Sequence, residues 1–290
     1  MKHDSHLVTI QERPKLRSPI LIAGFDGWPN AGNISTDSLS FLRSAFSVQK
    51  LATISPDLFY RYADSRPSAR IDEGEITEYS FSPYEFYFTH ADGEHDLILF
   101  SGNEPEMAWE QFTDLFLSLA AEFSVELLFT IGGTYDYITH NQDPLISGMI
   151  SHSSMRKSFQ ELGIKLAQYE GPISVHTVLL LEAKRRDMRC GSIWGHAPQY
   201  LQSNNLPVIH QVLDTLRKLG NFNLDLTEMK FKALELQKQI NILVQKSPEL
   251  SRIIEKIENG FHLKQSSPAA ETFHDKVIDI SGFMRRESHE

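Results

Sequence analysis

Short, nearly continuous apolar runs alternate with segments of helical periodicity up to about residue 200. The runs lie at residues 19–25, 96–100, 125–131 and 190–194. Runs of this kind are typical of parallel strands that are buried on both faces of a sheet. Between them, apolar residues recur every three or four positions, as in the predicted helix that ends near Phe123. The pattern therefore predicts an α/β protein with a mostly parallel sheet that helices cover on both sides.

A different pattern occupies residues 57–90. Residues 75–81 and 84–90 are rich in aromatic and β-branched side chains, which are typical of strands, and Pro83 lies between them. We expect these two strands to form an antiparallel insertion. Aromatic side chains and arginines are interleaved in residues 57–70, which are predicted to be irregular.

The pattern changes again after about residue 205. Residues 207–219 predict a helix, and the next helix carries a heptad-like apolar seam with steps of three and four. Pro248 interrupts this seam, and a second short helix follows at about 250–257. We expect the two helices to pack on their own chain, with packing on a partner as the alternative. The seam consists of Leu226, Met229, Ala233, Leu236, Ile240 and Leu243.

These patterns divide the chain into four regions. Residues 1–18 are polar and predict a flexible N-terminal arm, and residues 19–205 predict one α/β domain. Residues 206–260 predict the helical segment. The polar composition of residues 261–290 predicts a disordered tail.

Composition and charge exclude several classes of protein. The chain has 290 residues and a formal net charge of −10, from 28 basic and 38 acidic side chains, so no nucleic-acid partner is expected. Cys190 is the single cysteine, which rules out an intrachain disulfide and fits a reducing compartment. The sequence has no apolar stretch of about 18 residues and no apolar signal centre near its start, so neither a membrane span nor secretion is expected. These features predict a cytoplasmic protein.

The loop that follows the first buried run has an unusual composition. It reads Gly-Phe-Asp-Gly-Trp-Pro-Asn-Ala-Gly-Asn from Gly24 to Asn33. Its glycines permit backbone conformations that other residues avoid, and Asn30 and Asn33 are expected to accept hydrogen bonds from free N–H groups of the following helix. Neither Asp26 nor Trp28 is needed to make the turn. Because open α/β sheets bind ligands at the carboxyl ends of parallel strands, this loop is a candidate site.

Polar residues also follow the other predicted strands: Asn103 with Glu104, Thr134 with Asp136, Glu170, and His196. Asp26, Glu104, Glu170 and His196 are the candidate catalytic residues, because carboxylates and a histidine can share acid and base roles. The alternative is that they are ordinary turn and capping residues. The crevice at this edge is expected to be lined by Gly24, Gly27, Trp28, Asn30, Gly32, Asn33, Gly132, Gly133, Thr134 and Gly171.

Established catalytic and metal-binding signatures are absent from the sequence. There is no G-x-G-x-x-G, G-x-x-x-x-G-K-[ST], G-x-S-x-G or H-E-x-x-H. His140, His152, His176 and His196 lack the compact spacing of metal ligands and are expected at the surface or in caps. We therefore expect no metal and no cofactor. The lack of a lysine-bearing phosphate loop also argues against ATP-dependent ligation.

Several motifs occur in an order that resembles a known family. The first is the loop 24–33, followed by Tyr-Glu-Gly-Pro at 169–172 and Trp-Gly-His-Ala-Pro-Gln-Tyr at 194–200. Together they resemble the PAC2 family, named for proteasome assembly chaperone 2, over about residues 19–258. Further blocks that fit are Asp-Ser-Arg-Pro at 64–67, Glu104-Pro105 before Trp109, Gly132-Gly133, and the acidic helical end at about 224–258.

The resemblance implies a fold and a range of functions. The fold would be similar to purine nucleoside phosphorylases: a three-layer α/β/α sandwich with a mixed sheet, extended in bacterial-type members by a C-terminal helical segment. Those members resemble self-associating homo-oligomers, with a trimer as one arrangement. Eukaryotic and archaeal relatives act as chaperones of 20S proteasome assembly.

This chain departs from the family pattern in three places. The aspartate of the first block is Asn30 here, and the Pro-His-Thr-Arg-Pro block after the double glycine is replaced by residues 138–144. The last six residues, 285–290, lack the hydrophobic-Tyr-any ending through which several partners dock on the proteasome. The second difference weakens an inferred shared site, and the third argues against classical proteasome engagement.

Two hypotheses for the function follow. The first is a non-enzymatic interaction or assembly-chaperone-like protein that forms a homo-oligomer and binds a protein partner. The alternative is a hydrolase or phosphorylase that acts on a small, nucleoside-like molecule in the crevice. The enzyme requires Asp26, Glu104, Glu170 and His196 to line one pocket, whereas the first hypothesis does not.

Overall fold

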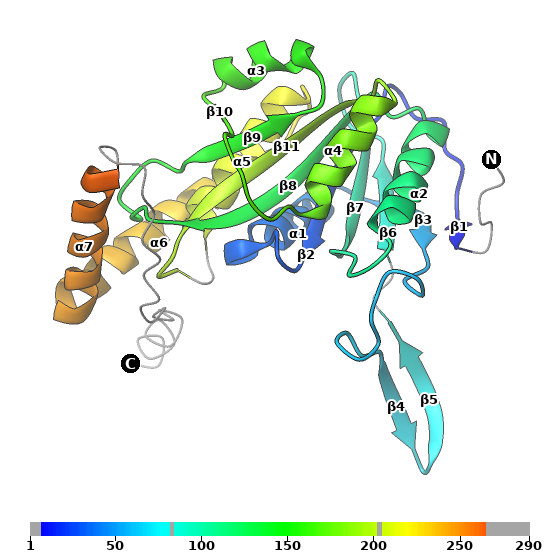
Figure 1. Ribbon diagram of the computed structural model, residues 1–290, viewed down its shortest axis with the longest axis horizontal. Helices are drawn as coiled ribbons and strands as arrows, with labels where there is room; N and C mark the ends of the chain where they lie inside the picture. The colour runs from blue at the N-terminus through cyan, green and yellow to red at the C-terminus, as the bar shows by residue number, and fades with distance from the viewer. Residues whose placement is uncertain (1–6, 82–83, 202–204, 265–290) are drawn as a thin grey trace.

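A nine-stranded mixed sheet runs through the centre of the protein (Figure 1). The computed structural model describes residues 7–81, 84–201 and 205–264. The strands are β1 (Val8–Ile10), β2 (Ile20–Asp26), β3 (Gln49–Ile54), β6 (Tyr84–Thr89), β7 (Leu97–Asn103), β8 (Leu127–Asp136), β9 (Ile146–Ile150), β10 (Lys165–Leu166) and β11 (Arg189–Pro198). Across the sheet they lie in the order β1-β3-β6-β7-β2-β8-β11-β9-β10.

The centre of the sheet is parallel and most of its flanks are antiparallel. Strands β7, β2, β8 and β11 run parallel to one another, whereas β6 is antiparallel to β7 and β9 is antiparallel to β11. The predicted mixed α/β sheet is confirmed. Because the four central strands share one direction, their carboxyl ends meet at one edge of the sheet. We call this edge the carboxyl edge.

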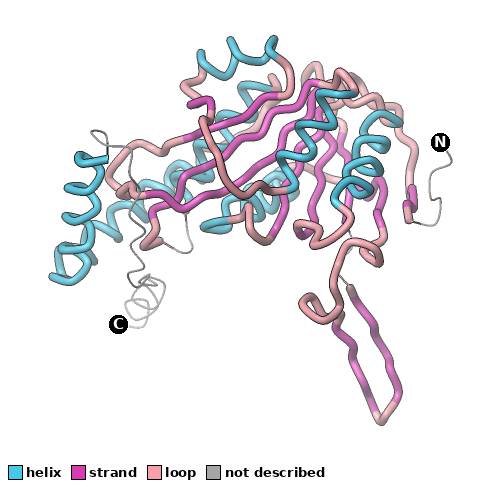
Figure 2. Tube along the Cα trace, viewed as in Figure 1, coloured by secondary structure: helices cyan, strands magenta, loops and turns pink. Residues whose placement is uncertain are grey.

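Helices cover both faces, which gives three layers (Figure 2). On β2, Ile20 and Ile22 pack into the core beneath α1 (Ile34–Ala45) and α5 (Leu206–Leu219). Leu21, Ala23 and Phe25 pack into the core beneath α2 (Trp109–Glu122) and α4 (Val175–Arg185). Successive strand side chains point to opposite faces, so an uninterrupted apolar run such as β2 supplies both cores. Three shorter helices are η1 (Ala31–Asn33), η2 (Ser153–Met155) and α3 (Arg156–Glu161).

The C-terminal helices α6 (Thr227–Lys246) and α7 (Pro248–Lys264) extend the body at one end. The predicted seam is buried within the chain, since Leu226 and Met229 join the core beneath α5 and Leu236 packs with Tyr200 and Ile254. The expectation of packing on the same chain is therefore confirmed. Residues 265–290, most of the expected tail, lie outside the described residues.

The region before β7 differs from the prediction. Residues 75–80 and 84–89 do not pair with each other: the first form β5 (Glu75–Ser80), which pairs with β4 (Ser68–Asp72), and the second form β6 of the central sheet. The predicted antiparallel insertion is wrong in its partners. Phe86 and Phe88 are buried, whereas every residue of β4 and β5 is exposed. Both segments have strand-forming residues, but only the second has an apolar face that fits the core.

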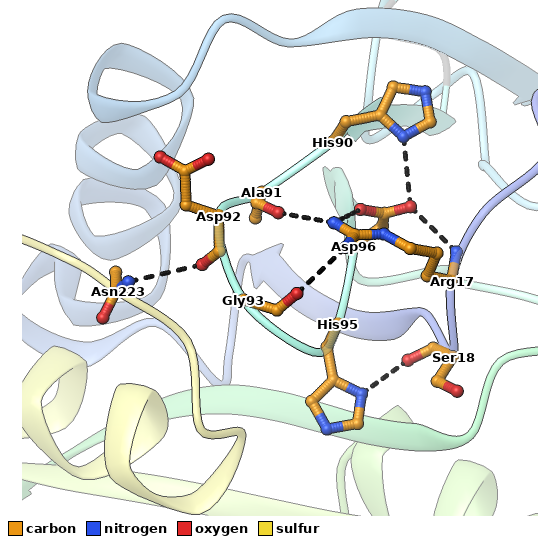
Figure 3. Close-up of polar contacts among 9 residues, drawn as sticks. All are labelled: Arg17, Ser18, His90, Ala91, Asp92, Gly93, His95, Asp96 and Asn223. Atoms are coloured by element: carbon orange, nitrogen blue, oxygen red, sulfur yellow. Dashed lines mark hydrogen bonds and ion pairs between the residues drawn. The ribbon is translucent and has the colours of Figure 1, made fainter.

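Residues 7–18 belong to the expected flexible arm but contact the body at several places, so the prediction is wrong for them, and residues 1–6 lie outside the described residues. Strand β1 pairs with β3, and Arg17 closes a polar cluster around Asp96 (Figure 3). Arg17 donates to both carboxylate oxygens of Asp96, from its backbone N–H at 2.8 Å and from Nη2 at 3.0 Å. It also donates to the carbonyl oxygens of Ala91 and Gly93, and His90 Nδ1 lies 3.1 Å from Asp96 Oδ2. This cluster joins the start of β2 to the turn before β7.

Candidate functional site

The loop after β2 is ordered by Asp26 and Asn30. Asp26 Oδ1 accepts hydrogen bonds from the N–H of Gly27 and from Nδ2 of Asn30, both at 2.8 Å. Asn30 Oδ1 in turn accepts from the N–H groups of Ser35 at 2.9 Å and Thr36 at 3.2 Å, in the first turn of α1. The capping role expected of Asn30 is thus confirmed, and Asp26 holds the cap in place.

Asn33 does not cap the helix, so that part of the prediction is wrong. It lies directly before α1 in a left-handed conformation, with φ 58°, and its side chain makes no capping hydrogen bond. Asparagine tolerates this conformation better than most residues, which accounts for its presence at this position.

Glu104 lies beside this loop, just after β7. Its N–H donates to the carbonyl oxygen of Asp26 at 2.7 Å, and its Oε1 accepts from the N–H of Val175 at 2.8 Å. Val175 is the first residue of α4, where a carboxylate interacts favourably with the helix dipole. Burial raises the pKa of Glu104 and outweighs the opposing effect of the Val175 hydrogen bond. The carboxylates of Asp26 and Glu104 therefore accept hydrogen bonds that stabilise a turn, a helix cap and a helix N-terminus close to each other.

Two glycines allow other elements to approach the loop closely. Gly133 on β8 donates its N–H to the carbonyl oxygen of Pro29 at 2.7 Å, and a Cβ added at Gly133 would lie 2.3 Å from the carbonyl oxygen of Ala31. Gly32 has φ +63°, and its carbonyl oxygen accepts from Asn205 Nδ2 at 3.1 Å. The loop is therefore held between β8 and the start of α5.

His196 belongs to a second polar group farther along the sheet. Its Nδ1 lies 2.9 Å from Asp136 Oδ2, and its Nε2 lies 2.8 Å from Ser147 Oγ. Strands β8, β11 and β9 each supply one member. Ser147 pairs with Trp194, two residues before His196, so these side chains share one face of the sheet. Ser147 was not among the predicted site residues, because β9 is a strand of only five residues and was not predicted.

Glu170 is separate from both groups. It is exposed in the loop before α4, and its side chain forms no hydrogen bond or ion pair with any residue that the structure describes. The structure thus brings Asp26 and Glu104 together and places His196 with Asp136 and Ser147.

Exposed aromatic and apolar side chains border the carboxyl edge. They are Trp28, Tyr135, Tyr169 and Ile173, with exposed fractions of 61%, 42%, 67% and 47%. Trp28 follows Asp26, Tyr135 is near the end of β8, and the other two lie in the loop before α4. We call these four residues the aromatic rim. Large side chains of this kind contribute most to the free energy of binding when another molecule buries them.

Two other histidines differ from expectation. His140 and His176 are buried, so the prediction of surface or capping positions is wrong for them, whereas His152 does accept a capping hydrogen bond in η2. His176 Nδ1 lies 3.2 Å from Thr130 Oγ1 and 3.3 Å from Ser192 Oγ. Burial lowers the pKa of His176 to about 3, so its imidazole is neutral at physiological pH.

A cavity of about 350 Å³ lies at the base of the β4–β5 hairpin. None of the ten predicted crevice residues lines it. Its lining consists of Tyr60, Ser65, Arg66, Pro67, Ser68, Ser80, Phe81 and Asn103.

Within the described parts of the chain, no three His, Cys, Asp or Glu side chains are arranged to hold a metal ion. No described helix combines the length and apolar character that crossing a membrane requires.

The fold and this edge define a class: an α/β protein with a parallel sheet centre, capped strand ends and an exposed aromatic rim. The family model of the PAC2 family matches residues 24–244. The chain belongs to the PAC2 family. No curated protein sequence matches it.

Solved structures share the fold at low sequence identity. A PAC2 family protein from Streptomyces avermitilis has a TM-score of 0.72 and 23% identity, covering 81% of this chain and 99% of its own. A proteasome-assembly chaperone homologue from Mycobacterium tuberculosis has a TM-score of 0.73 and 20% identity, covering 81% and 99%. An archaeal proteasome activator from Pyrococcus furiosus has a TM-score of 0.63 and 18% identity, covering 81% and 97%.

Proposed function

We propose that this protein is a non-enzymatic, assembly-chaperone-like protein that forms a homo-oligomer and binds a protein partner through the aromatic rim. One contrast at the carboxyl edge carries the proposal. The carboxylates of Asp26 and Glu104 accept hydrogen bonds from turns and a helix start, while Trp28 and Tyr169 are exposed. Carboxylates that already accept structural hydrogen bonds are poorly suited to acid–base catalysis. Exposed aromatic side chains, in contrast, are well suited to burial by a partner protein.

General properties of interfaces support this assignment. Tryptophan and tyrosine are enriched among the residues that dominate binding energy, because each buries a large area at a small entropic cost. Ile173 adds an aliphatic contact beside Tyr169. The family membership and the likeness to a proteasome-assembly chaperone homologue and a proteasome activator agree with a protein as the ligand.

Site-specific photocrosslinking tests the proposed contact. A photoreactive phenylalanine analogue in place of Trp28 is expected to capture one defined protein in the cells that make this chain, because Trp28 would lie inside the interface. Tyr169→Ala in the same protein is expected to weaken binding about 30-fold and to remove most of the adduct. Mass spectrometry of the adduct measures both outcomes.

The matched control places the same analogue at Lys157, whose side chain is 83% exposed on α3, away from the rim. It is expected to give no such adduct. Equal adducts at both positions, or an adduct at position 28 that Tyr169→Ala leaves unchanged, would show that the rim is not the contact surface.

One specific observation favours the hydrolase alternative, through a set of residues that shares only His196 with the predicted catalytic set. Ser147, His196 and Asp136 form a hydrogen-bonded chain in the order nucleophile, base and orienting carboxylate. In an acyl transfer, Ser147 Oγ would attack the carbonyl carbon while its proton passes to His196 Nε2. The bond from that carbon to the leaving group would then break, and His196 would give the proton to the departing group. The alternative then requires Ser147 to be more reactive than an ordinary serine.

A fluorophosphonate probe separates the two functions, since it labels activated serines covalently. The proposed function predicts no labelling of Ser147 beyond that of Ser158, a serine on α3 that serves as the internal reference. Rapid labelling at Ser147 that His196→Ala abolishes would support the hydrolase instead. Tryptic mass spectrometry identifies the labelled serine.

A further inference from the structure

The cavity at the base of the β4–β5 hairpin shares no residue with the aromatic rim or with the polar group around His196. Three parts of the chain form its walls: the loop that leads into β4, the end of β5, and the last residue of β7. Two features of the sequence meet here, the Asp-Ser-Arg-Pro block at 64–67 and Asn103 at the end of a predicted strand. The proposed function uses neither of them.

Arg66 brings a positive charge to the cavity wall, and it forms no ion pair with a described residue. The carboxylates near it in the chain and in space have other partners. Asp64 pairs with the guanidinium of Arg61 at 3.2 Å. Glu106 accepts hydrogen bonds from the N–H of Arg61 at 2.6 Å and from the hydroxyl of Ser65, and it does not line the cavity. Because a guanidinium binds carboxylate and phosphate in a bidentate fashion, Arg66 is suited to hold an anion from outside the protein.

The backbone is held on both sides of Arg66. Before it, the N–H of Ser65 donates to the carbonyl oxygen of Arg61 at 2.9 Å. After it, the ring of Pro67 restricts φ, and Ser68 is the first residue of β4. Part of the ordering that a ligand would otherwise have to impose is therefore already present in the fold, which favours binding.

The other polar groups of the wall are uncharged. The hydroxyl oxygens of Ser68 and Ser80 lie 2.7 Å apart, so one donates to the other and one O–H remains for a ligand. The side-chain amide of Asn103 makes no hydrogen bond with a described residue and offers N–H donors. Burial raises the pKa of Tyr60 to about 12, so its phenol is neutral and does not repel an anion. One cation and several neutral donors thus face the cavity.

Aromatic side chains supply an apolar wall. The half-buried ring of Phe81 contacts the rings of Tyr60 and Tyr62 edge-on, with centroids 4.9 Å and 5.4 Å apart. Pro67 adds a further apolar surface. Flat rings pack well on surfaces of this kind. The volume of about 350 Å³ is near the lower end of small-molecule sites, which span about 300–1,000 Å³, so it exceeds what a simple ion requires and fits a single ring system.

We propose that this cavity binds a small organic anion in which a carboxylate or phosphate group is attached to a flat ring. Arg66 would hold the anionic group, Asn103 and a serine hydroxyl would donate hydrogen bonds to it, and Phe81 would pack on the ring. This binding does not depend on the protein partner proposed above, because no residue of the cavity belongs to the aromatic rim. It assigns no reaction to the site.

Isothermal titration calorimetry of the full chain with four small molecules tests the class of ligand. Adenosine monophosphate offers a ring with a phosphate, and indoleacetate offers a ring with a carboxylate. At least one of them is expected to bind, and the one that binds identifies the anionic group. Adenosine, which lacks the anion, and inorganic phosphate, which lacks the ring, are each expected to bind at least about tenfold more weakly. Binding by neither ring-bearing anion, or equal binding by inorganic phosphate, would overturn the proposal.

A pair of arginine variants tests the role of Arg66. Arg66→Gln is expected to weaken binding of the ring-bearing anion about 30-fold, because it removes a charged hydrogen-bond donor. Arg66 is exposed, so the variant should fold, which circular dichroism checks. Arg70→Gln is the matched control, since Arg70 lies on β4 outside the cavity and pairs with Glu78 at 3.1 Å. It should leave the affinity unchanged. Equal affinities of the two variants would contradict the assignment of Arg66.

Fluorine NMR locates the ligand. A para-fluorophenylalanine at position 81 is expected to give a resonance that shifts with the same saturation curve as the calorimetry. The same analogue at Phe231, exposed on α6, should show no shift. A ligand that binds without moving the resonance at position 81 would place the site elsewhere and overturn the proposal. Arg66→Gln should leave the adduct at position 28 in place, so failure of this site and failure of the proposed function are distinguishable.

Discussion

Replacing Gly133 with alanine is expected to lower the free energy of unfolding by about 3 kcal/mol, because the added methyl group meets backbone atoms. The Cβ would lie 2.3 Å from the carbonyl oxygen and 3.1 Å from the nitrogen of Ala31. No side chain can rotate to relieve this contact, so η1 must move away from β8. The hydrogen bond from Gly133 to Pro29 would then lengthen or break. Urea unfolding followed by circular dichroism measures the loss.

The neighbouring residue supplies the control for this prediction. Thr134 is half-buried and its hydroxyl makes only a 3.5 Å contact with the carbonyl oxygen of Tyr135. Thr134→Ala is expected to change the free energy of unfolding by no more than about 0.5 kcal/mol. A Gly133→Ala protein with the wild-type urea midpoint would contradict the close packing of η1 against β8. Trp28 lies in the displaced loop, so Gly133→Ala should also reduce the adduct at position 28.

Asp96→Asn is expected to cost about 3 kcal/mol, because it breaks a buried ionic cluster without changing its volume. The side chain of Asp96 is fully buried and both of its oxygens accept hydrogen bonds from Arg17 (Figure 3). An asparagine amide has one oxygen and one NH2 group, so an N–H would face a donor of Arg17. Asp92→Asn is the control, since Asp92 is exposed in the same turn, and it should leave the free energy of unfolding unchanged.

The effect of Asp96→Asn should depend on pH. Burial raises the pKa of the Asp96 carboxyl. Hydrogen bonds from the Arg17 N–H, from His90 and from the Arg17 guanidinium lower it by a larger amount, so the pKa lies below its usual value. A carboxyl with a depressed pKa stabilises the fold fully above its unfolded pKa of about 3.9, and this contribution is lost as the pH falls through the lower folded pKa. The difference between wild type and Asp96→Asn should therefore be constant near neutral pH and shrink in acid. A difference that stays undiminished well below the unfolded pKa would contradict the cluster as described.

Much of the local structure follows from the sequence alone. The apolar runs at β2, β7, β8 and β11 are short and bounded by turn residues, which favours strands, and the seam of α6 repeats every three or four positions, which favours a helix. Because parallel strands present their carboxyl ends at one edge, the gathering of polar residues there was also predictable. The ordered motifs pointed to the family that the match over residues 24–244 then showed.

The grouping of polar side chains at that edge was decided by the tertiary structure. Strand order across the sheet depends on how the chain crosses over, and this order separates Asp26 and Glu104 from His196. Ser147 contacts His196 only because β9 lies antiparallel beside β11. The sequence of a five-residue strand does not predict this pairing. Long-range contacts of this kind have no local signature.

Composition alone also could not separate β5 from β6. Both have strand-forming residues, yet one projects from the body in an exposed hairpin and the other is buried in the central sheet. Likewise, Arg17 and Asp96 are 79 positions apart in the chain but form one buried cluster. Sequence periodicity determined which segments became strands and helices, because it reflects the geometry of the backbone. Packing in three dimensions decided which surfaces met and which were left uncovered, because burial depends on residues far away in the chain.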